Sequence, residues 1–251
     1  MIPKIIHYCW FGKKPLPPLA LKCIASWKKY LPNFEIKQWN EDNYDVNCIP
    51  YVAEAYNAKK YAFVSDYARL DILYKYGGVY FDTDVELIKP IDDIIEKGSF
   101  MGFEINPTKW NYGYVNPGLG FGVIPNLPII ASLLTIYKHK HFVLHNGKVK
   151  DGETIVDYTT EVLMTHGMKQ SPGVQVVDGV SLYPSDYFAP IHFISRRLHI
   201  TQNTRSIHQY MATWKEQKSK SFVDYIKHYL PECVIIWQNR LRHPRNIKYQ
   251  E

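Results

Sequence analysis

The segment between residues 59 and 90 constrains the fold more than any other part of this chain. Apolar side chains recur at helical spacing from Tyr61 to Tyr76. Gly77-Gly78 then ends the helix, because glycine readily adopts the left-handed backbone of a helix cap. The apolar run Val79-Tyr-Phe81 follows at once and predicts a strand, which Asp82-Thr-Asp84 closes. A helix that turns directly into a strand is typical of α/β folds.

The N-terminal part of the chain shows the same alternation of strand and helix. Ile2–Ile6 predicts a buried strand that ends in the aromatic-rich loop His7–Gly12, a helical pattern follows Pro18, and Phe34–Trp39 predicts a second strand. This order predicts a parallel α/β sheet with right-handed crossovers. Further along, the sequence predicts a glycine-rich turn at 116–122 and helices at 127–137 and 153–167.

The composition is that of a globular protein with an excess of aromatic residues. Hydrophobic residues make up 46% of the 251 residues and charged residues 22%, which excludes a disordered or fibrous chain. Tyr, Phe and Trp make up 15%, so we expect some of these rings to line a binding surface. The net charge of +6 is too moderate to indicate nucleic acid as a partner.

The sequence predicts a cytoplasmic protein. No apolar stretch is long enough to cross a bilayer, and the N-terminus lacks the apolar core of a signal peptide. The cysteines show no spacing typical of a metal site, and the reducing cytoplasm is their natural compartment. They are Cys9, Cys23, Cys48 and Cys233.

Asp82 and Asp84 are the first candidate site residues. In an extended segment alternate side chains share a face, so both carboxylates should project to one side together with Tyr80. At the C-terminal end of a sheet strand, two such oxygen donors suit Mg²⁺ or Mn²⁺ that keeps open positions for substrate phosphates. The alternative is a pair of turn carboxylates that cap backbone amides. On the preceding helix, Asp66 and Arg69 are either functional or a surface ion pair of small energy.

Four ordered motifs resemble the Asp-x-Asp sugar transferases, a family that includes bacterial capsular-polysaccharide transferases, yeast-type initiating mannosyltransferases and, more distantly, clostridial glucosylating toxins. The motifs are Pro3-Lys-Ile-Ile-His-x-x-Trp10, Ala62-x-x-Ser-Asp-x-x-Arg69, Leu73-Tyr-x-x-Gly-Gly-Val-Tyr-x-Asp-x-Asp84, and His208 with Thr213-Trp214. The resemblance is to glycosyltransferase family 32 and the GT-A type. It implies an α/β, Rossmann-like fold with a mixed, mainly parallel sheet flanked by helices.

The resemblance implies four nucleotide-binding residues. Trp10 matches the aromatic residue that stacks on the base, and Tyr8 lies in the same loop; the alternative for Trp10 is a place in the core. Trp214 would donate its indole N–H to the diphosphate. Thr213 stands where many relatives carry serine, and either hydroxyl can bind phosphate.

The resemblance also implies the metal ligands and the residues that bind the donor sugar. Asp82 matches a carboxylate shared between ribose and metal, Asp84 a direct metal ligand, and His208 the residue that completes the metal shell. Asp66 and Arg69 match positions that hold the donor sugar and phosphates. Asp84, Arg69 and Asn116 are the catalytic candidates. Asn116 resembles a loop residue near the donor sugar, although Asn-Pro-Gly is also a common turn; Trp110, Tyr112 and Tyr114 beside it are candidates for stacking on sugar rings.

The implied activity is metal-dependent transfer of a hexose or N-acetylhexosamine from a nucleotide sugar to a glycan, with retention of configuration. UDP is favoured over GDP because the bacterial relatives use it more, and a lipid-linked precursor of capsular polysaccharide is the expected acceptor. Two alternatives stay open. One is a phosphatase of the haloacid dehalogenase type, whose nucleophilic Asp lies on the first strand, and the other is a non-catalytic module that binds glycans or membranes.

The resemblance is absent after about residue 215, so we expect a transferase domain at 1–215 and a basic, aromatic helical appendage at 216–251. Residues 218–251 hold seven Lys or Arg and three Asp or Glu, which gives 7 − 3 = +4 of the net charge. Such a segment suits the anionic inner face of the plasma membrane, where the protein would be peripheral. The alternative is a C-terminal helix that packs on the domain and leaves its basic end in solvent.

Overall fold

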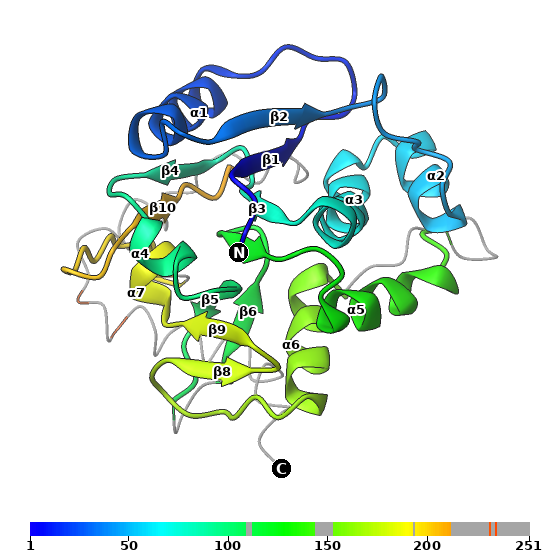
Figure 1. Cartoon of the computed structure of the whole chain (residues 1–251). Helices are drawn as coiled ribbons and strands as arrows, with labels where there is room; N and C mark the ends of the chain where they lie inside the picture. The colour runs from blue at the N-terminus through cyan, green and yellow to red at the C-terminus, as the bar shows by residue number, and fades with distance from the viewer. Residues whose placement is uncertain (109–111, 144–152, 193, 212–230, 232–233, 235–251) are drawn as a thin grey trace.

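The computed structural model describes residues 1–108, 112–143, 153–192, 194–211, 231 and 234. An eight-stranded sheet lies at its centre, in the order β2-β1-β3-β7-β5-β9-β8, with β6 paired to β5 (Figure 1). Its strands are β1 (Ile5–Cys9), β2 (Glu35–Trp39), β3 (Gly78–Tyr80), β5 (Phe100–Ile105), β6 (Tyr114–Asn116), β7 (Phe121–Val123), β8 (Gln175–Val177) and β9 (Val180–Tyr183).

The sheet is mixed, and most of its strands run in one direction. β1 is parallel to both β2 and β3, and β5 is parallel to β9. Because β7 is antiparallel to both β3 and β5, these two groups point the same way, so five of the eight strands share one direction. The predicted α/β class, with a mixed, mainly parallel sheet, is therefore confirmed.

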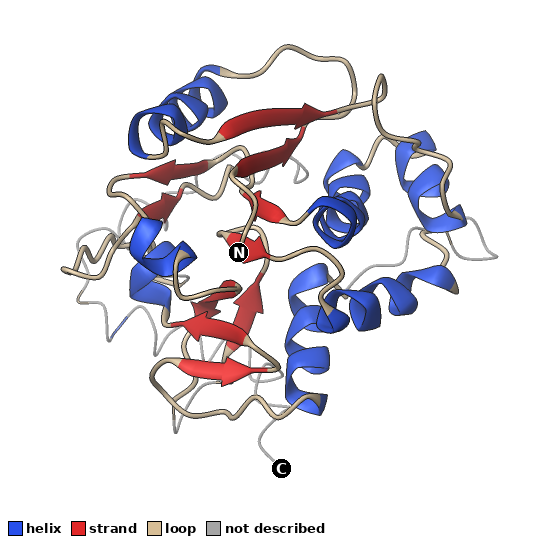
Figure 2. Ribbon diagram, in the orientation of Figure 1, coloured by secondary structure: helices blue, strands red, loops and turns tan. Residues whose placement is uncertain are grey.

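Helices cover both faces of the sheet, as Figure 2 shows. One apolar core lies under α2, α3, α5 and α6, and a second lies under α1, α4 and α7. The helices predicted after Pro18 and at 61–76, 127–137 and 153–167 are confirmed with small shifts at their ends, and three further helices among the described residues were not predicted. The bounds are α1 (Pro18–Tyr30), α2 (Pro50–Asn57), α3 (Tyr61–Tyr76), α4 (Asp92–Ile95), α5 (Pro128–Lys138), α6 (Ile155–Thr165) and α7 (Ser185–Phe188).

The first strand differs from its prediction: it spans Ile5–Cys9 and includes residues that we expected in a loop. The reason is His7, which is fully buried. Its Nε2 lies 2.9 Å from the carbonyl oxygen of Gly77, and Trp39 Nε1 donates to its Nδ1 at 3.1 Å. Burial lowers the pKa of His7 to about 4, so the ring is neutral and donates through Nε2. This histidine ties β1 to the turn after α3.

The glycine pair that ends α3 is required by close packing. Both Gly77 and Gly78 have positive φ, at 62° and 98°. A Cβ on Gly78 would lie 2.7 Å from the carbonyl oxygen of Ile5 and 2.9 Å from His7 Nε2. The helix end predicted at Gly77-Gly78 is confirmed, and glycine permits β3 to follow directly beside β1.

A separate two-stranded sheet joins distant parts of the chain. β4 (Val85–Leu87) pairs antiparallel with β10 (Ser206–His208), and His208 lies opposite Val85. The predicted turn at 116–122 is shorter than expected, because β6 ends and β7 begins inside this range. The predicted boundary near 215 and nearly all of the 216–251 appendage lie outside the described residues. None of the helices in the described ranges is both long and apolar enough to span a bilayer.

Candidate active site

Asp82 and Asp84 lie in a tight turn between β3 and β4. The N–H of Val85 donates to the carbonyl of Asp82 at 3.0 Å, so the pair does not occupy the extended segment that we predicted. Their carboxylates nevertheless converge: one ligand atom each from Asp82, Asp84 and His208 lies within 4.8 Å of the others. The turn and the β4–β10 pairing together bring these three side chains to one point.

His208 forms a buried ion pair with Asp84. Its Nε2 lies 3.2 Å from Asp84 Oδ1, and Met211 N–H donates to Asp84 Oδ2 at 2.8 Å. Burial opposes the charge on both groups, but their attraction outweighs it, so the pKa of Asp84 lies below its ordinary value and that of His208 above. His208 Nδ1 is buried and has no hydrogen-bond partner among the described residues.

Arg69 is buried beneath Asp82 and is not part of a surface ion pair. Its Nη2 lies 2.9 Å from Asp66 Oδ1 and 3.2 Å from Asp82 Oδ1, and its Nε donates to the carbonyl of Ser65 at 3.2 Å. Tyr80 lies beside this group, with its hydroxyl 3.2 Å from Asp82 Oδ1. The guanidinium, whose side chain is 5% exposed, is thus committed to two carboxylates. Contact between Arg69 and a donor phosphate stays a prediction.

Asp66 is the most perturbed carboxyl group in this cluster. Burial raises its pKa to about 7; the nearby Arg69 acts in the opposite direction, and Asp82 adds to the rise. The attraction of Asp82 and Asp66 raises the pKa of Arg69, which therefore stays charged. One permanent cation thus holds two carboxylates in fixed positions.

The loop after β6 closes against Asp82. Asp82 N–H donates to the carbonyl of Gly118 at 3.0 Å, and Gly118 N–H donates to Asn116 Oδ1 at 2.7 Å. A Cβ on Gly118 would overlap the Asp82 carboxylate and would approach Arg69 Nη1 to 2.9 Å. Asn116 thus lies in the loop that contacts Asp82 and shapes its own turn, and its contact with the donor sugar stays a prediction. Gly118 was not anticipated from the sequence, although its place in a glycine-rich run was the available signal.

Trp10 and Tyr8 have different surroundings. Trp10 follows β1, next to parallel β3, so it lies at the same sheet edge as Asp82; it is partly exposed and its Nε1 donates to the carbonyl of Lys14 at 2.6 Å. Tyr8 is buried against Trp27, and its hydroxyl donates to Gln38 at 2.9 Å. Tyr8 therefore serves the core in this structure, whereas Trp10 is accessible for the predicted base stacking.

Three of the predicted ligand-binding residues lie outside the described residues. These are Trp110, Thr213 and Trp214. The ring centres of Tyr112, just before β6, and Tyr114, on β6, are 5.7 Å apart. Two of the predicted sugar-stacking rings are therefore adjacent.

Glu104, at the end of β5, is a site residue that we did not predict. Burial raises its pKa, while the positive charge of His208 and polar contacts from Tyr210 and Asn116 favour the carboxylate. The available signal was a single charged residue in the apolar run Phe100–Ile105. One charge in a strand is commonly at the solvent face, so this signal is weak by itself.

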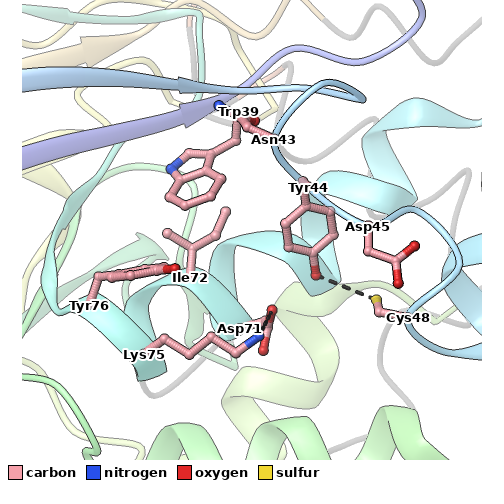
Figure 3. A pocket seen from close by; sticks show the side chains of 9 residues that line it. All are labelled: Trp39, Asn43, Tyr44, Asp45, Cys48, Asp71, Ile72, Lys75 and Tyr76. Carbon is pink, nitrogen blue, oxygen red and sulfur yellow. Dashed lines mark hydrogen bonds and ion pairs between the residues drawn. The ribbon is translucent and has the colours of Figure 1, made fainter.

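A hollow of about 140 Å³ lies apart from these carboxylates, between the end of β2 and the outer side of α3 (Figure 3). Figure 3 shows Trp39, Tyr44 and Tyr76 around it, with Lys75 paired to Asp71 at 2.8 Å. None of Asp82, Asp84 and His208 lines it. The hollow is therefore separate from the candidate active site.

Residues 17–101 match the family described as "Glycosyltransferase sugar-binding region containing DXD motif", and this range contains Asp66, Arg69 and both motif aspartates. Together with two relatives, this match supports a place for the chain among the DXD-motif glycosyltransferases. Asp82-Thr-Asp84 is the DXD sequence within the matched range, and the match supports a glycosyltransferase rather than the phosphatase alternative.

Two relatives and one solved structure are also similar to this chain. The chain is 28% identical over 155 residues to inositol phosphoceramide mannosyltransferase 1 of Schizosaccharomyces pombe, over 56% of this chain and 45% of the yeast protein. It is 27% identical over 197 residues to an uncharacterized glycosyltransferase of Acanthamoeba polyphaga mimivirus, over 76% and 74%. A solved structure, PaToxG glycosyltransferase, has a TM-score of 0.48 at 19% identity, over 65% of this chain and 69% of that one. The chain thus spans less than half the length of the yeast relative.

Proposed function

We propose that this chain is a metal-dependent glycosyltransferase. It transfers a hexose or N-acetylhexosamine from a nucleotide sugar to a glycan acceptor and retains the configuration at the anomeric carbon. The observation that carries the proposal is the convergence of Asp82, Asp84 and His208 within 4.8 Å in a chain of the DXD family.

The residues at this point fit a divalent cation. Two carboxylates and an imidazole form a donor set suited to Mn²⁺ or Mg²⁺. His208 has one buried ring nitrogen without a partner among the described residues, and its other nitrogen faces Asp84. A bound cation would replace the proton on His208 and neutralise part of the charge on the departing diphosphate.

The protein side chains fix the geometry of this chemistry. Arg69 holds Asp82 and Asp66, and Gly118 accepts the N–H of Asp82, so the first motif aspartate is oriented before any donor binds. Asn116 lies beside this loop and can contact the donor sugar. Trp10 offers a ring for the base, and Thr213 and Trp214 would bind the diphosphate. Preorganised charge and donors of this kind lower the barrier to departure of the nucleoside diphosphate.

The finer features of the proposal are supported by the family resemblance. The donor is UDP-linked rather than GDP-linked, and the acceptor is a lipid-linked polysaccharide precursor of the capsular kind. The basic segment 218–251 contacts anionic lipid at the cytoplasmic face of the membrane. Co-sedimentation with phosphatidylglycerol vesicles tests this contact. Replacement of Arg240, Arg242, Arg245 and Lys248 by glutamine should release the full chain into the supernatant, and unchanged partitioning would contradict it.

Calorimetric titration and donor hydrolysis test the activity itself. We expect UDP to bind in the presence of Mn²⁺ and more weakly without it, and UDP-sugars to be hydrolysed slowly in the absence of acceptor. Asp84→Asn removes a ligand charge, so hydrolysis should fall by about 100- to 1,000-fold, which corresponds to roughly 3–4 kcal/mol of transition-state stabilisation.

The matched control is Asp92→Asn, the same change at an exposed position on α4. It should bind UDP and hydrolyse UDP-sugar as the unmodified protein does. The metal-dependent function would be refuted if Asp84→Asn retained full activity, or if neither UDP nor GDP bound with Mn²⁺, as expected of a non-catalytic module.

A further inference from the structure

Glu104 sits at an irregularity in the sheet beside the DXD site. On β5, Phe103 pairs with Val115 and Ile105 pairs with Tyr114, so Glu104 is an extra residue opposite a single step of β6. A bulge of this kind changes the direction of a side chain and is frequent next to active sites. The same β6 ends in Asn116, which lies in the loop that closes on Asp82. The bulge therefore places a carboxylate where the sheet meets the candidate active site.

The groups around Glu104 come from three other segments of the chain. Asn116 and Tyr210 direct polar groups at its carboxylate, and His208 and Arg196 supply positive charge nearby. The Tyr210 ring lies 4.2 Å from the ring of His208, and the Arg196 guanidinium lies 4.3 Å from the centre of the Tyr210 ring. Glu104 is partly exposed, so a ligand can reach it.

The backbone at this point also departs from ordinary geometry. Arg196 and Tyr210 have φ of 61° and 51°, a left-handed conformation that is uncommon for residues other than glycine. Both residues contribute to the surroundings of Glu104. Left-handed residues of this kind persist where surrounding structure holds them, and they cluster at ligand sites.

Glu104 and Arg69 belong to two different clusters of interacting groups near the motif aspartates. Arg69 interacts with Asp66, Asp82 and Tyr80, whereas Glu104 interacts with His208 and Arg196. His208 interacts with both Asp84 and Glu104, which places the predicted metal ligands between the two clusters. Asp66 and Arg69, which are predicted to hold the donor, belong to the first cluster, so we assign the Glu104 cluster to the group that attacks the donor.

We propose that Glu104 is an acceptor-binding residue whose carboxylate accepts hydrogen bonds from hydroxyl groups of the acceptor sugar. The inference rests on the proposed transferase function and adds a site for the second substrate. A carboxylate can accept from two adjacent hydroxyls of a hexose, and such charged hydrogen bonds are stronger than neutral ones. Asn116 and Tyr210 direct polar groups at the carboxylate, and the positive charges of His208 and Arg196 oppose the rise in its pKa that burial causes.

Saturation-transfer NMR on the full chain tests the proposal with a panel of p-nitrophenyl hexosides, in the presence of UDP and Mg²⁺. The variants are Glu104→Gln and, as a matched control, Glu161→Gln, the same change at an exposed position on α6. Glu104→Gln should weaken hexoside binding by about 10- to 100-fold, the range for loss of hydrogen bonds to a charged group. Its affinity for UDP with Mg²⁺ should stay within about twofold, and Glu161→Gln should change neither.

Three results would overturn the acceptor role. The first is unchanged hexoside binding in Glu104→Gln, and the second is no hexoside binding to the unmodified protein while UDP binds. The third is an equal loss of UDP affinity in Glu104→Gln, which would assign Glu104 to the donor. Failure of the unmodified protein to bind UDP with either metal would instead refute the proposed function. Circular dichroism of Glu104→Gln separates a local effect from misfolding.

Discussion

The two motif aspartates have different cationic partners, and this is the most informative contrast in the molecule. Asp82 is held by Arg69, whereas Asp84 is held by His208. Arginine keeps its proton under all ordinary conditions, but histidine can lose its proton and then donate a lone pair to a metal. Asp82 therefore has a permanent positive partner, which it shares with Asp66. In the proposed metal site the partner of Asp84 would change from counter-ion to fellow ligand, so we expect the Asp84 side of the motif to respond to metal more strongly than the Asp82 side.

The largest effect should come from removing the permanent cation. Arg69→Met leaves Asp66 and Asp82 without a charged partner in a buried setting, so the free energy of unfolding should fall by about 3–5 kcal/mol. Urea unfolding measures it. The control is Lys75→Met on the same helix, where an exposed pair with Asp71 should contribute no more than about 0.5 kcal/mol. Equal effects of the two substitutions would show that Arg69 is not a buried structural cation.

The buried His7, which ties β1 to the turn after α3, should make the free energy of unfolding depend on pH. His7 has a folded pKa of about 4 and an ordinary unfolded value, so the unfolded chain binds more protons between these values. Stability due to His7 is therefore complete near neutral pH and is lost as the pH falls from about 6.5 to 4, by about 3 kcal/mol in total. Urea midpoints at several pH values measure it, and His7→Asn should show a flatter dependence. Parallel curves for the two proteins would contradict the neutral, buried His7.

The imidazole of His208 should affect metal binding more than folding. His208→Gln removes the imidazole, so UDP affinity in the presence of Mn²⁺ should fall by about 10- to 100-fold, while metal-free UDP affinity changes little. His139→Gln, at an exposed position after α5, is the control. Titration calorimetry with and without Mn²⁺ gives both affinities. If the loss were the same in the absence of metal, His208 would contact the nucleotide instead.

The smallest effect should come from the loop that closes on Asp82. Gly118→Ala inserts a methyl group against the Asp82 carboxylate and Arg69. We expect a loss of about 1–2 kcal/mol, at the lower part of the usual range because the Asp82 side chain is 26% exposed and can turn aside. Thermal melting measures it, and addition of Mn²⁺ should recover less stability than in the unmodified protein. A fully metal-responsive Gly118→Ala would show that Asp82 is free to move.

The local signals in the sequence predict the fold well where they are strong. The helix at 61–76, its glycine stop and the following strand were all correct, because spacing and glycine act over a few residues. The predicted end of β1 was wrong. Histidine is a polar residue that is common in loops, and only the two buried hydrogen bonds of His7 explain its place in a strand. Those partners, Gly77 and Trp39, are distant in the sequence, so no local pattern could reveal them.

The candidate site shows the same limit. Asp82, Asp84 and His208 were chosen from motifs, and the structure brings them together; their roles stay predictions. The extended geometry expected for the two aspartates was wrong, because the hydrogen bond from Val85 to Asp82 makes a turn. Glu104 and Gly118 were missed, since their importance depends on strand register and on the approach of two loops. Such features arise from packing between β5, β6 and the DXD turn.

The pairing of β4 with β10 determines when the candidate active site is completed during synthesis of the chain. Asp84 and His208 are separated by 208 − 84 = 124 residues, and Met211 supplies a further bond to Asp84. While the protein is being synthesised, the DXD motif emerges long before its histidine partner, so the nascent domain has its two carboxylates but an incomplete set of the proposed ligands. The proposed metal site can therefore form only after residue 211 has left the ribosome and the late strand has docked.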